Sequence, residues 1–155
     1  MKIKPYQLKI MTVLFFVLLM NGFILTGSVR ADKDEALQTA KNYLDSMPFS
    51  RTALEELLLF SGYSFEEAEY AVDNSGADWK EMAAQSAAFY LSSTDYSKNG
   101  LIRQLESAAE GYTHEEAVYG VEKAGKDVNW FEMAERRAAF YLRSNVFSEI
   151  GRAHV

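Results

Sequence analysis

One short block of sequence occurs three times along the chain, and this repetition constrains the fold more than any other feature. The block at residues 40–44 returns at 87–91 and at 138–142, and its tyrosine recurs at intervals of 47 and 51 residues. Six residues after each tyrosine, an aromatic residue is followed by serine. Recurrence at nearly equal intervals is typical of chains built from stacked copies of one small unit.

The repetition divides the chain into units of the same kind. We expect a first repeat over 33–77, a second over 78–128, and the start of a truncated third over 129–148. Residues 149–155 resemble the translation of a sequencing-adapter read, so we expect this tail to be non-native and the natural third repeat to continue.

Each repeat has the pattern of three short helices. In the segment 34–46, apolar residues return at every third or fourth position, which is the spacing of one helix face. Ser64 and Thr113 each precede a glutamate by three positions, the pattern of a capping box, while Asp78 and Asn129 suit the N-cap of longer helices. The expected class is therefore all-α, with tandem helix-turn-helix-like, three-helix repeats. Helices are predicted over 34–46, 50–60, 64–74, 78–93, 97–109, 113–124 and 129–144.

The long helices that open the second and third repeats carry an aromatic stripe at helical spacing. Such a stripe could line a ligand groove, but a helix of this size needs one buried apolar face for its own stability. We therefore expect Trp79, Tyr90 and Leu105 to be largely buried, with Trp130 and Tyr141 buried as well if the third repeat is complete.

The first 31 residues have the composition of a targeting segment. Lys2, Lys4 and Lys9 precede an almost wholly apolar run over 10–25. Such a run partitions into lipid while the lysines stay on the cytoplasmic side, so residues 1–31 are expected to be a signal peptide or a single-pass membrane anchor. If this segment is cut after Ala31 the protein is secreted, and if it is kept the repeats are displayed on the extracellular face of the cell membrane.

A short motif at the end of the apolar run bears on how the protein is attached. Residues 25–28 resemble the signal box of a lipoprotein, with Ser28 at the position of the lipidated cysteine. A serine hydroxyl does not accept a thioether-linked lipid, so lipidation at this position is excluded.

Charge and composition exclude several function classes. Four of the 16 basic residues and none of the 22 acidic residues lie within residues 1–31, which leaves a net charge of −10 on the rest. Because nucleic-acid binding draws its affinity largely from cations that contact phosphate, we expect no nucleic-acid partner. Cysteine is absent and only two histidines are present, so no metal site, cofactor or catalytic residue is predicted, and the chain is not expected to be an enzyme.

Several of the repeated motifs resemble a known family. Leu-Ile-Arg-Gln-Leu at 101–105, Gly-Tyr-Thr-x-Glu-x-Ala at 111–117 and Tyr-Gly-Val at 119–121 look like the Ltp-type helix-turn-helix repeat of host cell surface-exposed lipoproteins. The family occurs in Gram-positive bacteria and their prophages, and the resemblance covers 33 to about 148. It implies helical repeats displayed outside the membrane and, for a prophage member, superinfection exclusion. Ser28 departs from the family pattern, which leaves the lipid anchor in doubt, and the family assigns no catalytic residues.

Two functions agree with these observations. The first is a cell-surface protein-interaction module that excludes superinfecting phage by binding a basic phage protein at the membrane. The alternative is a structural cell-envelope protein. The candidate partner-binding residues are acids on the third helix of each repeat, which should point away from Phe65, Ala68 and Val72. These acids are Glu66, Glu67, Glu69, Asp73, Glu115, Glu116 and Glu122.

Overall fold

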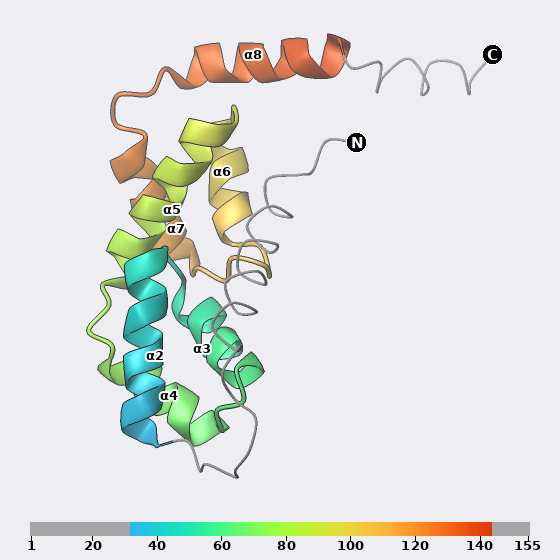
Figure 1. The fold of residues 1–155 in the computed structure, drawn as a ribbon. Helices are drawn as coiled ribbons and strands as arrows, with labels where there is room; N and C mark the ends of the chain where they lie inside the picture. The colour runs from blue at the N-terminus through green and yellow to red at the C-terminus, as the bar shows by residue number, and fades with distance from the viewer. Residues whose placement is uncertain (1–31, 144–155) are drawn as a thin grey trace, which may run out of the picture.

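The computed structural model describes residues 32–143, and within this range every regular element is an α-helix. The first repeat holds α2 (Lys33–Ser46), α3 (Arg51–Phe60) and α4 (Phe65–Asn74); the second holds α5 (Trp79–Ser93), α6 (Lys98–Leu105) and α7 (His114–Ala124); α8 (Trp130–Arg143) follows (Figure 1). The predicted all-α class is confirmed, and the arrangement agrees with tandem repeats. The predicted anchor and the doubtful tail lie outside the described residues.

Side-chain caps explain where the helices begin. Both predicted capping boxes are present: Ser64 caps α4, Thr113 caps α7, and a glutamate reaches back to the backbone in each. The carboxylate of Asp78 accepts hydrogen bonds from two backbone N–H groups at the start of α5. The recurring aromatic–serine pair also has a structural role, because Ser50 and Ser97 are the N-caps of α3 and α6. These caps satisfy N–H groups that have no partner within the helix.

The prediction for the middle helix of the second repeat was wrong at its C-terminus. We expected a helix over 97–109, but α6 ends at Leu105. In the first repeat, the turn after the middle helix is closed by a hydrogen bond from Tyr63 N–H to the Leu58 carbonyl. In the second repeat, the corresponding bond runs from Tyr112 N–H to the Leu105 carbonyl. The closing bond spans two more residues in the second repeat, and these residues form an extra turn instead of extending the helix.

Each repeat has its own hydrophobic core. The first is built around Leu54, Leu58 and Val72, and the second around Tyr90 and Leu105. The last two side chains are fully buried, as predicted. The cores therefore combine the long, middle and third helices of one repeat.

The two tryptophans connect one repeat to the next. Trp79 opens α5 yet packs against the first core, and Trp130 opens α8 yet packs against the second. These two helices therefore bridge each repeat to the one that precedes it. The ring of Trp79 is less buried than expected, because it is only partly buried. The expectation for Trp130 and Tyr141 depended on a complete third repeat; Trp130 is partly buried and Tyr141 is 37% exposed.

Small residues allow α5 and α7 to approach closely. A Cβ atom added at Gly120 would lie 2.6–2.8 Å from backbone atoms of Ala83 and Ala84. Real Cβ atoms do not come so near to backbone, so this position in α7 requires glycine. The matching position in the first repeat is Ala71, where a methyl group is accommodated.

Candidate functional site

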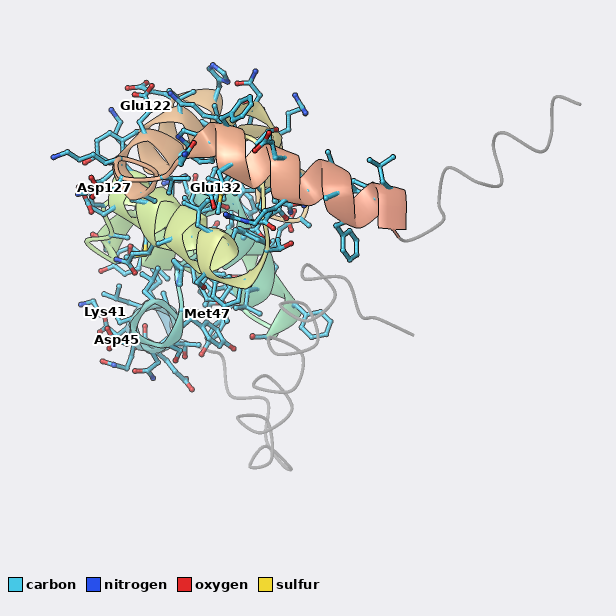
Figure 2. All side chains as sticks on the ribbon, turned by 90° about the horizontal axis from the view of Figure 1, so that it is seen from above. Lys41, Asp45, Met47, Glu122, Asp127 and Glu132 are labelled. Atoms are coloured by element: carbon cyan, nitrogen blue, oxygen red, sulfur yellow. The ribbon has the colours of Figure 1, made fainter. Side chains whose placement is uncertain are left out.

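The seven candidate acids lie on α4 and α7, as the repeat pattern predicted. Ala68 and Val72 lie on the buried face of α4, as expected. Phe65 was expected on the same face, but its side chain is 59% exposed. Phe65 is the first residue of α4, and its side chain lies outside the packed part of the helix. Acidic residues are also present elsewhere: Asp45 of α2 lies on the opposite side of the molecule from the candidate Glu122 in Figure 2.

Two of the seven acids are occupied by the helix caps. Glu67 accepts a hydrogen bond from Ser64 N–H at 2.8 Å, and Glu116 accepts one from Thr113 N–H at 2.9 Å. Replacing either acid would weaken the start of its helix. Glu67 and Glu116 therefore have a structural role that is sufficient to explain them.

Three more of the acids form ion pairs with neighbouring helices. Asp73 pairs with Arg51, Glu115 with Lys80 at 2.6 Å, and Glu122 with Lys98 at 3.0 Å. The hydrogen bond from Lys80 and its positive charge lower the pKa of Glu115. Because these pairs are exposed, each contributes little to stability, but each offsets the negative charge of its acid.

Glu66 and Glu69 remain. Both side chains are exposed, and neither forms a hydrogen bond or ion pair within residues 32–143. The two residues are three positions apart on α4, so they lie on the same side of the helix. The structure therefore reduces seven candidate acids to two whose charge is not offset by a described neighbour.

A second polar cluster, which the sequence did not reveal, lies across α5 and α7. The ammonium groups of Lys80 and Lys123 lie 5.9 and 5.6 Å from the ring centre of Tyr119. Glu81 accepts a hydrogen bond from the Tyr119 hydroxyl at 2.9 Å and pairs with Lys123, whose hydrogen bond lowers the pKa of this carboxyl. The four-residue interval between Tyr119 and Lys123 was a local signal for part of this cluster, but their contacts with α5 were not visible in the sequence.

The second core also contains a buried acid. Glu110 is 3% exposed and accepts a hydrogen bond from the Tyr90 hydroxyl at 2.5 Å. In the first repeat, the Tyr43 hydroxyl instead bonds the hydroxyl of Ser61. Burial, followed by the bond to Glu110, raises the pKa of Tyr90. Both partners are held inside the fold, so this pair is a structural contact and offers no group to a ligand.

Buried phenols predict a loss of stability at alkaline pH. Burial raises the pKa of Tyr112, whose hydroxyl bonds that of Ser86 at 2.9 Å. A tyrosine whose folded pKa exceeds its unfolded value contributes stability that is complete below the unfolded pKa, about 10, and falls as the pH rises above it. Urea unfolding at several pH values should show this fall, by up to about 1.4 kcal/mol per pH unit for each such phenol.

The substitution Tyr112→Phe should make that alkaline fall less steep, because phenylalanine cannot ionise. Equal slopes for the Tyr112→Phe variant and the unmodified protein would contradict the assignment.

Within the described residues, no set of three or more acidic or histidine side chains could hold a metal ion. The same residues include no helix with the length and apolar character needed to span a bilayer.

Comparison with protein families gives an independent view of the repeats. The model of the family described as host cell surface-exposed lipoprotein matches residues 32–74 and 78–123, which correspond to the first two helical repeats. No curated protein and no solved structure gives a significant match. The family description is consistent with a cell-surface role, and the family is not a known enzyme family. The matched segments cover more than half of the sequence, and the chain therefore belongs to the Ltp family of host cell surface-exposed lipoproteins.

Proposed function

We propose that this chain is a cell-surface binding module that stops phage DNA from entering the cell by binding a basic phage protein at the outer face of the membrane. Residues 1–31 would attach it there, whether as an uncut anchor or in another way. The observation that carries the proposal is the acidic surface of α4, where Glu66 and Glu69 have no partner among the described residues.

The charge of the first repeat supports a basic partner. Residues 32–77 contain ten acidic and three basic residues, whereas 78–128 contain nine acidic and five basic residues. Acids on α7 are offset by Lys80 and Lys98, so the second repeat presents a weaker negative field near its third helix. A negative field speeds the approach of a positively charged protein and disfavours anionic surfaces. The first repeat is therefore the better candidate for the initial contact.

Charge reversal on α4 tests the proposal in cells. The protein is expressed in a sensitive Gram-positive host, which is challenged with related phages while adsorption and DNA entry are measured separately. We expect normal adsorption and blocked DNA entry with the unmodified protein. Glu66→Lys combined with Glu69→Lys should restore DNA entry, because the surface would then repel a basic partner.

The matched control moves the same two charge reversals away from α4. Asp45 and Glu56 are exposed on α2 and α3, and reversing both gives the same net charge. This control should still block DNA entry. If both double variants lost the block equally, net charge and not the α4 surface would be responsible. If the unmodified protein left DNA entry unchanged for a broad panel of phages, exclusion would be wrong and a structural envelope role would be favoured.

A further inference from the structure

A group of exposed apolar side chains lies where α3 ends and α4 begins (Figure 1). Leu59 and Phe60 are the last two residues of α3, and Phe65 is the first residue of α4. Their exposed fractions are 39%, 68% and 59%. Exposed apolar residues that occur singly are ordinary, whereas a group of them at one place often marks a contact surface. These three residues are called the α3–α4 tip below.

The second repeat shows that the fold does not require an apolar tip. The residues at the three corresponding positions are Glu106, Ser107 and His114. Nδ1 of His114 lies 2.5 Å from a carboxylate oxygen of Glu106, so the same place is polar there. A capped helix begins after this turn in both repeats. The turn and the helix start are therefore compatible with polar side chains, and they do not explain the apolar ones of the first repeat.

The tip belongs to a repeat whose three helices are all described. Leu54 and Leu58 of α3 and Val72 of α4 are buried in the first core. Phe60 and Phe65 lie outside this core, although they belong to the helices that form it. Each helix thus already has its buried face, and the tip is a separate apolar surface.

Two carboxylates adjoin the tip. Glu66 follows Phe65 directly, and Glu69 lies one helical turn further along α4, on the side of both. Neither carboxylate forms a hydrogen bond or an ion pair with a residue in 32–143. A lysine or arginine of a partner can contact the face of an aromatic ring and pair with a carboxylate beside it. The surface therefore offers both an apolar and a negatively charged part.

These carboxylates distinguish between the possible occupants of the tip. Anionic phospholipid headgroups would be repelled by them. A second copy of the chain would bring its own Glu66 and Glu69 against the first pair, and like charges that face each other in an interface are unfavourable. A protein segment with lysine or arginine among apolar side chains complements both parts of the surface.

We propose that the α3–α4 tip, Glu66 and Glu69 form one docking surface for a basic amphipathic segment of the partner protein. The apolar side chains of the segment pack on the three tip residues, and its lysines or arginines pair with the two carboxylates. This inference rests on the proposed function and adds that charge alone does not hold the partner. The second repeat, whose tip is polar, does not bind the segment.

Exchanging the tip between the repeats separates packing from charge. The combined change Leu59→Glu, Phe60→Ser and Phe65→His gives the first repeat the polar tip of the second. A purely electrostatic contact would be strengthened by the added carboxylate, whereas loss of the apolar anchors should restore phage DNA entry. The matched control combines Phe89→Ser with Phe131→Ser, which removes two exposed aromatic rings elsewhere and should still block DNA entry. Thermal unfolding followed by circular dichroism should give both variants the melting temperature of the unmodified protein.

A second measurement uses no phage. The full chain in phosphatidylcholine nanodiscs is titrated with a fluorescent lysine–leucine peptide, or with a lysine–serine peptide of equal length and charge, and empty nanodiscs give the background. The lysine–leucine peptide should bind about tenfold more tightly or better, and the tip exchange should weaken its binding by about the same factor. Equal binding of the two peptides, or binding that the tip exchange leaves intact, would overturn the proposal.

The two measurements separate this inference from the proposed function. A variant with the exchanged tip that still blocked DNA entry would overturn the role of the tip and leave phage exclusion standing. If the unmodified protein blocked no phage, exclusion would be wrong, and the peptide titration would still decide on the docking surface. Self-association abolished by the tip exchange, seen by analytical ultracentrifugation, would overturn the proposal in favour of a second copy. Slower hydrogen exchange at the tip in phosphatidylglycerol than in phosphatidylcholine nanodiscs would overturn it in favour of the membrane.

Discussion

Replacing Tyr90 with alanine is expected to lower the free energy of unfolding by about 3–5 kcal/mol, the usual range for removing a large buried aromatic side chain. Tyr90 is fully buried, and its ring meets the edge of Tyr96 at a centroid distance of 5.8 Å. Its hydroxyl also bonds Glu110, so the substitution leaves a buried carboxyl without this donor. Thermal or urea unfolding followed by circular dichroism gives the measurement.

The adjacent residue provides the control for this prediction. Phe89 precedes Tyr90 in α5 but is 46% exposed, and Phe89→Ala should cost less than about 1 kcal/mol. Tyr90→Phe should have an intermediate cost, about 1–3 kcal/mol, because it keeps the ring and removes the hydroxyl that bonds Glu110. If Phe89→Ala and Tyr90→Ala cost the same, the burial described for α5 would be incorrect.

The substitution Gly120→Leu should destabilise the second repeat by about 3 kcal/mol, at the upper end of the usual cost of overpacking. Even a Cβ atom at this position would collide with the backbone of α5 at Ala83 and Ala84, and backbone cannot rotate away as a side chain can. The two helices would have to separate, which would open the core around Tyr90. Unfolding in urea would measure the loss.

The control for Gly120→Leu introduces the same side chain into the same helix. Glu122 is exposed on α7, so Glu122→Leu should change stability by about 0.5 kcal/mol or less. Leucine favours helix more than glycine does, so intrinsic propensity alone predicts that Gly120→Leu stabilises. A gain in stability would therefore show that α5 and α7 do not approach each other as described.

The helices were predictable because their signals are local. Ser64, Thr113 and Asp78 mark helix starts within a few residues, and the apolar periodicity identifies the buried face of each long helix. The end of α6 was not predictable in this way. It depends on a closing hydrogen bond to Leu105 and on the two inserted residues that form the turn before Tyr112.

The candidate site was predictable only as a set of acids on particular helices. Which acids are offset depends on contacts between residues far apart in sequence, such as Lys80 with Glu115 and Arg51 with Asp73. Glu110 shows the same limit, since a glutamate in a polar turn has the pattern of a surface residue, yet it is buried against Tyr90. Sequence spacing locates a residue on a helix but does not give its tertiary neighbours.

The position of Trp79 has a consequence for how a protein of this kind can change in length. The first turn of α5 packs against the core of the first repeat, while the remainder of α5 forms part of the core of the second repeat. Trp130 and α8 stand in the same relation to the second core. If a whole repeat were duplicated, the new copy would contain the tryptophan that packs against the core of the repeat before it. If a whole repeat were deleted, each remaining core would still be covered by such a tryptophan. Duplication of a whole unit could therefore lengthen such an array, and deletion could shorten it, without new core residues having to evolve at the junctions.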